Sequence, residues 1–276
     1  MIKNIIFNCI SILPNHIIGV SKIKSFIISF LDIDIYKFCS VSKNFKIEIN
    51  LKDKSENYLW YGNIPEEITK FLHTNLNSNS AFVDCGANIG IWSTIALEVI
   101  KSEGFVYSFE PNPNLFLRLT KNIKFNNLTS RCNCYELALS SKSRSSFLYL
   151  DDHHHQMGSL HYREKNKKLK VNLITLDTLK LCQIDGMKID VEGHELQVVK
   201  GAMKTLANHK PWLVVELNNS FYDVQYIKEW EVYHLLTEIG YSTNFDMDQN
   251  LNHSFCRDII FYDTAKSNKE QLPPFL

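Results

Sequence analysis

A strand, a glycine turn, a helix and a second strand follow one another within residues 82–114, and this order constrains the fold more than any other feature. A short apolar run ends in Asp84, and a turn with Gly86 and Gly90 follows at once. A second apolar run ends in Glu110, 20 residues after Gly90. Such a loop lets the backbone approach a nucleoside, and the acid after the next strand accepts hydrogen bonds from ribose hydroxyls. The sequence therefore predicts a nucleoside-binding α/β domain.

The glycine pattern distinguishes between nucleosides. A dinucleotide fingerprint counted from Gly86 needs glycine at positions 88 and 91, where this chain has Asn88 and Ile91. Those glycines serve a pyrophosphate on a helix N-terminus. S-adenosylmethionine (SAM) has a ribose and an adenine but no phosphate, its amino group can pair with Asp84, and Asn tolerates a left-handed backbone. The loop favours a methyl donor over NAD, although a turn that binds nothing also uses glycine.

Four segments taken together resemble the motifs of the FkbM-type methyltransferases, a branch of the class I SAM-dependent enzymes. They are DCGANIG, SFEPNPN, ITLDTL from Ile174 and KIDVEGHE from Lys188, in the family's order within about residues 45–218. The resemblance implies a seven-stranded class I (Rossmann-like) fold, SAM as cofactor, and O-methylation of a hydroxyl on a saccharide, glycoconjugate or secondary metabolite. Matched position by position, it assigns cofactor binding to Asp84, Gly86, Asn88, Gly90, Glu110 and Asn112.

The composition of the chain indicates which class of acceptor and which cell compartment to expect. The 276 residues suit one large domain, or one domain with an appendage. Lys plus Arg equals Asp plus Glu at 30 each, so the chain lacks the basic footprint of a nucleic-acid binder. We therefore expect a small-molecule or glycan acceptor. The seven cysteines form no Cys-x-x-Cys pair, and the absence of a disulfide pattern favours a cytoplasmic protein.

The N-terminal segment is apolar but does not read as a membrane span. Residues 5–13 are interrupted by Asn8 and followed by Pro14, well before the ~20 apolar residues that a span needs. Apolar residues then recur with helical spacing over residues 23–31. We expect residues 1–35 to dock onto the domain or onto a partner subunit. Peripheral membrane contact is the alternative.

The rest of the chain alternates between strands and helices, which predicts a parallel, doubly wound sheet. Ala138, near the end of the third strand, is small enough to leave room for an adenine ring. We expect an N-terminal helical extension, a strand/helix cap, the SAM-dependent domain and a C-terminal tail at residues 1–40, 41–75, 76–265 and 266–276. The expected strands are 45–51, 81–85, 105–109, 132–137, 186–190, 212–217, 241–245 and 258–262, and the expected helices are 65–72, 89–101, 114–126, 193–207 and 228–239.

An insertion interrupts this alternation. Residues 146–150 and 169–174 read as the two strands of a hairpin between the third and fourth strands of the sheet. His153, His154, His155 and His161 lie between them. We interpret this stretch as a solvated loop over the pocket, with metal binding as the alternative.

Carboxylates stand at the ends of four predicted strands. In an open parallel sheet the ligand lies outside the carboxyl ends of the strands, where Asp84, Glu110, Asp190 and Glu216 fall. With the first two assigned to the cofactor, Asp190 and Glu216 face the acceptor. Asp190 is our first candidate for the general base and His194 the second, because imidazole titrates near neutral pH. The structural alternative is that Asp190 only caps the following helix.

Three alternatives remain open at this point. Asp190, Glu216 and Asn218 could form an oxygen-rich Mg²⁺ site, although we predict no metal. An NAD-dependent oxidoreductase shares the scaffold. A non-catalytic partner subunit of the same fold is the third alternative, suggested by the apolar N-terminal segment.

Overall fold

The computed structural model describes residues 35–60, 62, 64–150, 158–160, 167–243 and 245–265. They divide into two compact units, one up to Glu66 and the other from Glu67. The expected N-terminal docking segment lies almost wholly outside these residues. Within the part of the chain that is described, no helix has both the length and the apolar character needed to cross a bilayer.

The first unit is an antiparallel hairpin followed by a helix. The alternation in residues 45–51 produces a strand with buried Ile47 and Ile49, as predicted. Residues 36–40, expected in a helical extension, instead form a strand. They pair with residues 46–50 along the full length of that strand. The carboxylate of the buried Glu56 accepts a hydrogen bond from the Asn50 amide at 2.6 Å. The elements are β1 (Tyr36–Ser40), β2 (Lys46–Asn50) and α3 (Lys54–Trp60).

The second unit is built on a seven-stranded sheet in the order β12-β13-β11-β10-β3-β4-β5. All neighbours are parallel except β13, which runs antiparallel to β11 and β12. This is the class I, Rossmann-like arrangement that the sequence predicted. The strands are β3 (Ala81–Cys85), β4 (Phe105–Phe109), β5 (Cys132–Tyr135), β10 (Gly186–Ile189), β11 (Trp212–Asn218), β12 (Tyr241–Thr243) and β13 (Cys256–Asp263).

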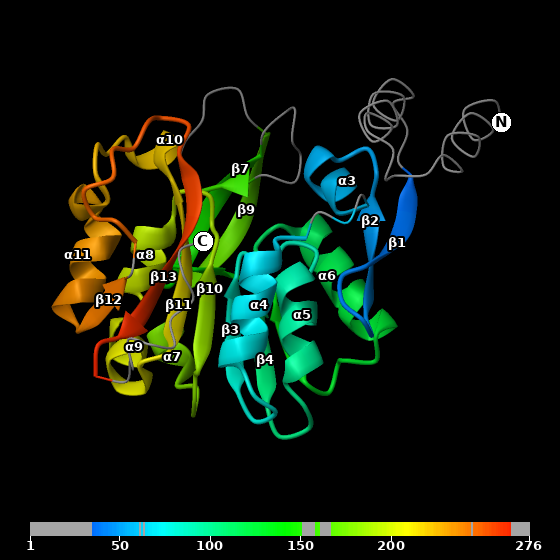
Figure 1. Ribbon diagram of the computed structural model, residues 1–276. Coiled ribbons are helices and arrows are strands. Elements are labelled where there is room, and N and C mark those ends of the chain that lie inside the picture. Colours follow the sequence, from blue (N-terminus) through cyan, green and yellow to red (C-terminus); the bar gives the residue numbers. More distant parts are fainter. Residues whose placement is uncertain are drawn as a thin grey trace. The chain divides into compact units, whose positions relative to one another are not determined.

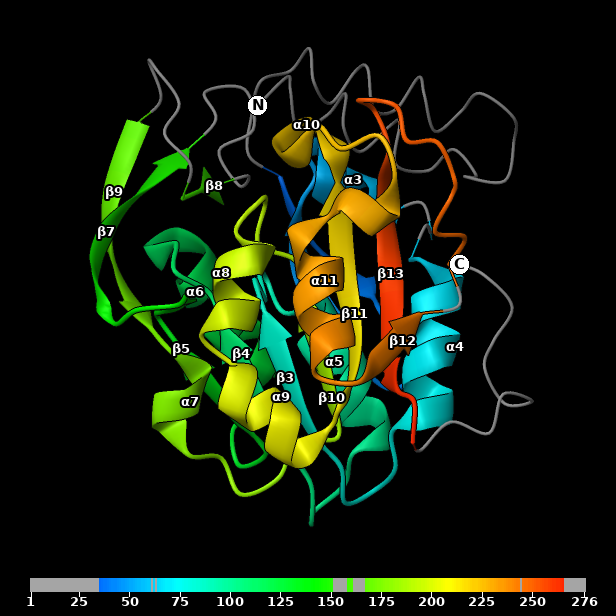
Figure 2. The same ribbon diagram turned by 90° about the vertical axis from the view of Figure 1, so that its left-hand side faces the viewer.

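Helices cover both faces of this sheet (Figures 1 and 2). On one face lie α4 (Glu66–Asn75), α5 (Ile91–Val99) and α6 (Pro113–Phe125), and on the other lie α8 (Glu195–Lys200), α9 (Met203–His209) and α11 (Glu231–Glu238). The predicted single helix 193–207 is wrong: it is interrupted between α8 and α9 at Gly201 and Ala202. Short helices occur at α7 (Leu176–Leu179), α10 (Asn219–Tyr222) and a 3-10 turn, η1 (Ile227–Glu229).

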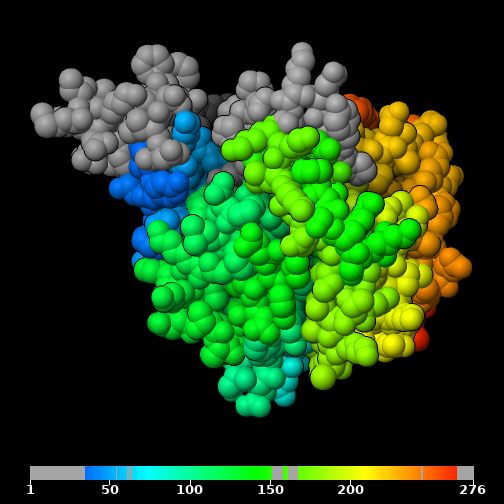
Figure 3. Space-filling view, turned by 180° about the vertical axis from the view of Figure 1, so that it is seen from behind, coloured from blue at the N-terminus to red at the C-terminus, as the bar shows by residue number. Residues whose placement is uncertain are grey.

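The predicted insertion forms a separate four-stranded sheet in the order β6-β9-β7-β8. Its small core consists of Ala138, Leu148, Leu150, Val171 and Leu173, all buried. The outer face of its two long strands is exposed, and Figure 3 shows the insertion in green as part of the surface of the second unit. The strands are β6 (Ala138–Leu139), β7 (Arg144–Leu150), β8 (Gly158–Ser159) and β9 (Lys167–Ile174).

Candidate active site

A row of polar side chains crosses the interior of the large sheet. Ser108, Asp84 and Lys188 stand in register on β4, β3 and β10, so that they share one face. Ser93 of α5 covers the row, with its Oγ 2.5 Å from Asp84 Oδ2 and 2.7 Å from Ser108 Oγ. All four are buried. A row of this kind at the centre of a sheet is costly unless its members are paired, which makes this face a candidate for a functional role.

One carboxylate oxygen of Asp84 is available to accept a hydrogen bond from a ligand. Its Oδ2 accepts from Ser93, whereas Oδ1 is buried without a hydrogen-bond partner. Burial raises the pKa of Asp84 to about 6, although the Ser93 hydrogen bond and the charge of Lys188 oppose the shift. A cationic donor at Oδ1 would satisfy this oxygen and favour the ionised carboxylate.

The glycine loop passes directly against the end of β10. Gly86, Asn88 and Gly90 have φ of 81°, 52° and 93°, which confirms the left-handed backbone predicted for the asparagine. A Cβ on Gly86 would lie 1.9 Å from the carbonyl oxygen of Asp190, so no side chain fits there. The Asn88 Oδ1 is buried without a hydrogen-bond partner. The loop therefore brings backbone and an acceptor oxygen to the carboxyl edge of the sheet.

Glu110 joins this loop to the start of α6. Its Oε2 accepts from the Asn88 amide at 2.9 Å and its Oε1 from the Asn112 amide at 2.8 Å. Burial raises the pKa of Glu110 to about 7, and the two amides oppose the shift. Each oxygen keeps a lone pair for a further donor, as ribose hydroxyls require. Asn112 itself caps α6, since its Oδ1 accepts from the Asn114 amide at 3.1 Å.

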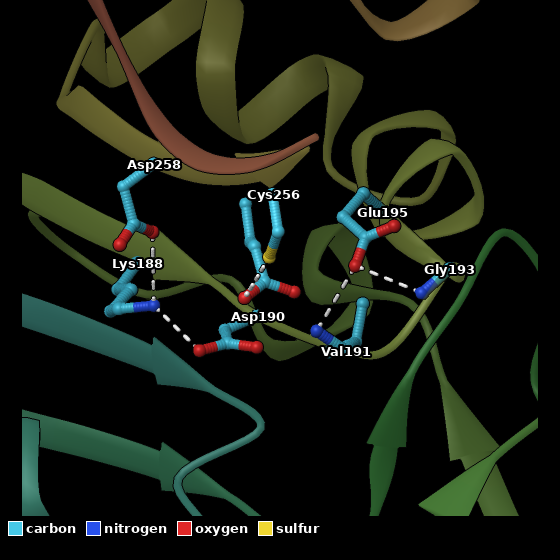
Figure 4. A network of polar contacts seen from close by, with 8 residues as sticks. Lys188, Asp190, Val191, Gly193, Glu195, Cys256 and Asp258 are labelled. Carbon is cyan, nitrogen blue, oxygen red and sulfur yellow. Dashed lines mark hydrogen bonds and ion pairs between the residues drawn. The ribbon is translucent and has the colours of Figure 1, made fainter. Parts of the chain in front are cut away.

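Asp190 lies at the carboxyl end of β10, beside the end of β3, as predicted. Its amide donates to the Cys85 carbonyl at 3.0 Å, and its Oδ2 is 2.8 Å from Lys188 Nζ. Lys188 Nζ also lies 3.3 Å from Asp258 Oδ1 (Figure 4). Burial by itself would lower the pKa of Lys188, but the charges of Asp190 and Asp258 raise it above its ordinary value. The helix cap is not the role seen here, because His194 occupies the N-cap position of α8.

Glu216 completes the group from β11, opposite Asp258 of β13. Cys256 Sγ lies 3.4 Å from its Oε1, and its Oε2 is buried without a hydrogen-bond partner. The charge of Asp190, followed by burial, raises the pKa of Glu216 to about 9. A pKa raised this far keeps Glu216 protonated at neutral pH.

This arrangement makes stability depend on pH through Glu216. The unfolded chain releases this proton near its ordinary value of 4.5, whereas the folded protein holds it up to about pH 9, so the contribution of Glu216 to the unfolding free energy falls between these values. Glu216→Gln has no proton to hold. We expect it to be more stable than the parent by about 1–3 kcal/mol at pH 9, with a smaller difference at pH 5. Urea unfolding at both pH values measures this, and equal differences would contradict it.

The second candidate base, His194, forms a hydrogen bond with a residue next to the insertion sheet. Its Nε2 lies 3.0 Å from the Oγ of Ser140, a buried residue that follows β6. The Ser140 carbonyl in turn lies against Gly201 at the end of α8. The structure therefore groups His194 with the packing of α8 against the insertion, and leaves Asp190 as the stronger candidate for the base.

Glu195 shapes the turn that follows Asp190. Its Oε1 accepts from the amides of Val191 and Gly193 at 3.2 and 3.1 Å, as Figure 4 shows, and its Oε2 accepts from the Tyr222 hydroxyl. Burial raises the pKa of Glu195, which these hydrogen bonds oppose. The Glu195 carboxylate thus holds the turn in place, and this role was not predicted from the sequence.

The insertion reaches this turn as well. Ser159 of β8 donates its hydroxyl to the Glu192 carbonyl at 2.8 Å. The four histidines expected to form a loop over the pocket lie outside the described residues. Ala138, expected beside the adenine, is packed in the core of the insertion sheet, in β6 rather than in the third strand of the large sheet.

The Mg²⁺ alternative finds no support in the geometry. Within the described residues, no group of three or more His, Cys, Asp or Glu side chains is placed to hold a metal ion. Asn218 caps α10, with its Oδ1 accepting from the Ser220 amide at 3.2 Å. The cation that lies among these carboxylates is the ammonium group of Lys188.

Lys188 and Glu195 were not predicted as site residues from the sequence. A lysine two positions before an acid, in a strand that otherwise reads as buried, signals an internal ion pair, because an unpaired buried charge is unstable. An acid shortly after a strand-to-helix turn signals a carboxylate that accepts the free amides of the turn. Lys188 and Glu195 both belong to the segment KIDVEGHE, so both patterns could be recognised there.

Comparisons with known proteins agree with this arrangement. The family described as "Methyltransferase FkbM domain" matches residues 84–252, more than half of the chain. The hexuronic acid methyltransferase AglP of Haloferax volcanii is 25% identical over 157 residues, which cover 55% of this chain and 62% of AglP. The methyltransferase sdnD of Sordaria araneosa is 30% identical over 161 residues, covering 46% of this chain and 62% of sdnD. The chain thus spans less than two thirds of the length of these curated relatives.

Among solved structures, a methyltransferase FkbM from Methylobacillus flagellatus KT superposes with a TM-score of 0.44 at 16% identity, covering 74% of this chain and 46% of that one. The family match contains the glycine loop, Glu110, Asp190 and Glu216, the residues that the large sheet brings to its carboxyl edge. The chain belongs to the FkbM methyltransferase family.

Proposed function

We propose that this chain transfers the methyl group of SAM to a hydroxyl of a saccharide, glycoconjugate or secondary metabolite. The observation that carries the proposal concerns two acids on adjacent strands. Asp84 has a buried oxygen without a hydrogen-bond partner, and Glu110 lies beside the left-handed glycine loop. The saccharide part is supported by the name of the relative from Haloferax volcanii, whose stated acceptor is a hexuronic acid.

The residues present fit SAM by the chemistry of their free acceptors. Asp84 Oδ1 and Asn88 Oδ1 are buried and lack donors, which an α-ammonium group and a ribose hydroxyl would supply. Glu110 follows the neighbouring strand, and each of its carboxylate oxygens keeps a lone pair for a further donor. When bound, SAM supplies a methyl carbon that bonds to the acceptor oxygen as its bond to sulfur breaks and the electron pair stays on sulfur.

Asp190 is the group we assign to the proton of the acceptor. Its side chain is 32% exposed, and its Oδ2 is bound to Lys188. The other oxygen can accept the hydroxyl proton, because a carboxylate has a free lone pair on each atom. Glu216, protonated beside it, can donate a hydrogen bond to a second oxygen of the acceptor. These residues orient the hydroxyl and take its proton.

A binding and turnover experiment tests this proposal. Titration calorimetry with S-adenosylhomocysteine and with NAD shows which nucleoside binds, and release of S-adenosylhomocysteine measures turnover on a panel of neutral sugars, uronic acids and hydroxylated small molecules. We expect binding of S-adenosylhomocysteine and turnover on a hydroxylated acceptor. Binding of NAD alone would support the oxidoreductase. Binding of S-adenosylhomocysteine without turnover on any acceptor would favour the non-catalytic partner subunit.

Glu110 offers a specific test of the cofactor site. Glu110→Gln keeps the volume but turns an NH₂ group toward a backbone amide, so we expect the affinity for S-adenosylhomocysteine to fall by about 1–3 kcal/mol. Glu195→Gln is the matched control, since Glu195 also accepts from two backbone amides but in a different loop. It should change stability without changing this affinity by more than about twofold. Equal losses in the two variants would show that Glu110 only holds its loop.

A further inference from the structure

Lys188 is an unexpected residue at the centre of the sheet. It lies within β10 between neighbours that are all buried, and its side chain is 2% exposed. An apolar residue of similar volume at such a position is often as stable as an ion pair or more so, because burying charges costs desolvation energy. The fold alone therefore does not account for an ammonium group here.

The ammonium group is fixed from three directions. Asp190 Oδ2 lies at 2.8 Å, Asp258 Oδ1 at 3.3 Å and the centre of the Trp92 ring at 5.7 Å. Asp258 belongs to β13 and Trp92 to α5, so two of these contacts do not depend on the turn that carries Asp190. The position of the charge is set by the sheet and its covering helix.

The exposed end of this chain of contacts is Asp190. Its side chain is 32% exposed, compared with 24% for Asp258 and 2% for Lys188. Figure 4 shows one carboxylate oxygen of Asp190 directed at Lys188 and the other turned away from it. One oxygen thus anchors the carboxylate, and the other is left for an acceptor.

The surroundings of Asp190 would otherwise disfavour its charge. Carboxyl groups face Lys188 from each neighbouring strand, and removal of the ammonium would leave them in repulsion, so that one would take up a proton. The charged, titratable or aromatic groups around Lys188 are Asp190 on its own strand, Asp84 on β3, Glu216 and Asp258 on β11 and β13, Cys256 beside Glu216, and Trp92 on α5.

From this geometry we propose that Lys188 is a positioning residue for methyl transfer: with Asp258 as its anchor, it holds one carboxylate oxygen of Asp190 so that the other faces the acceptor hydroxyl. This role rests on the proposed function, since it assigns Asp190 the proton of the acceptor. Lys188 itself does not contact the acceptor, because it is buried beneath Asp190.

The test uses Lys188→Met, which keeps an unbranched side chain only one atom shorter and removes the charge. We expect turnover to fall by about 10–10²-fold and the acid limb of its pH profile to move up by about 1–3 pH units, because Asp190 loses its counter-charge. Affinity for S-adenosylhomocysteine should stay within about threefold of the parent. Lys200→Met removes an exposed ion pair with Glu231, at 2.8 Å, and serves as the control for the loss of a lysine.

A structural role would give a different result. Lys188→Met would then lower the unfolding free energy and leave the pH profile where it was, which overturns the proposal. In the Asp190→Asn background, Lys188→Met should lower turnover no further, because its effect acts through Asp190. If Lys188→Met does not fold, Asp258→Asn keeps the lysine and removes a carboxylate that competes for it and repels Asp190, so it should move the acid limb down. An unmoved acid limb in that variant would overturn the proposal.

Failure of the proposed function is distinguishable from failure of this inference. If the parent protein turns over no acceptor, the carboxyl carbons can be titrated by ¹³C NMR without any ligand. Lys188→Met should then raise the pH at which the Asp190 carboxyl titrates, and an unchanged titration would overturn the role of Lys188 whatever reaction the protein performs.

Discussion

Asp190→Asn is expected to lower turnover by about 10²–10⁴-fold while the affinity for S-adenosylhomocysteine changes little. The amide keeps the size of the side chain and most of its hydrogen bonding to Lys188, but it cannot accept the proton of the acceptor. Initial rates with saturating acceptor, together with calorimetry, separate the two effects. A loss confined to the acceptor KM would indicate that Asp190 orients the acceptor and does not act as the base.

Asp185 is the matched control for this substitution. It precedes the same strand, at the end away from the site, and its carboxylate accepts from the Ala81 amide at 2.7 Å. Asp185→Asn should therefore lower stability and leave turnover per folded molecule unchanged. If Asp190→Asn behaves like Asp185→Asn, Asp190 leaves the catalytic assignment, and His194 becomes the candidate base.

Gly86→Ala is expected to abolish nucleoside binding, with at least about 10²-fold loss in affinity, and to lower the unfolding free energy by about 2–4 kcal/mol. The added Cβ would lie 1.9 Å from the Asp190 carbonyl oxygen, and the φ of +81° is strained for alanine. The loop must move away from β10, and this movement displaces the Asn88 and Asp84 oxygens from a common ligand. Calorimetry and urea unfolding measure the two effects separately.

Two other glycines show whether the effect is specific. At Gly201 a Cβ would also lie 1.9 Å from a carbonyl oxygen, that of Ser140, but the glycine lies between α8 and α9. Gly201→Ala should therefore cost stability without a matching loss of affinity. At Gly90 the φ of +93° is also strained for alanine, but the nearest atom, at 2.7 Å, is a side-chain methyl of Leu119 and not backbone, so Gly90→Ala should cost less than Gly86→Ala. Equal loss of affinity in all three would mean that binding only reports stability.

The sequence was most informative where the signals are local. The bounds of β3 and β4 agree with the predicted strands, and Asp84 and Glu110 fall where the motif spacing placed them. Alternation of strands and helices was sufficient to predict a parallel, doubly wound sheet, because short connections leave few other topologies. The left-handed Asn88 also follows from its local chemistry.

What escaped prediction depends on contacts between distant segments. Lys188 is explained by Asp258, 70 residues away, and Glu195 by Tyr222, 27 residues away. At the interruption after α8, Ser140 approaches Gly201 closely, which no helical periodicity reveals. The contact of His194 escaped prediction for the same reason, since its partner Ser140 is 54 residues away. Periodicity describes each element, but not which side chain of another element meets it.

The carboxylates of the site come from β3, β4, β10, β11 and β13, and therefore from both halves of the unit's sequence. A ligand that contacts several of them therefore binds the assembled sheet in preference to a partly folded form. At a free concentration of about 100 times its Kd, such a ligand would add about 2.7 kcal/mol to the stability of the whole unit. The lifetime of this protein against proteolysis would then follow the supply of its own methyl donor.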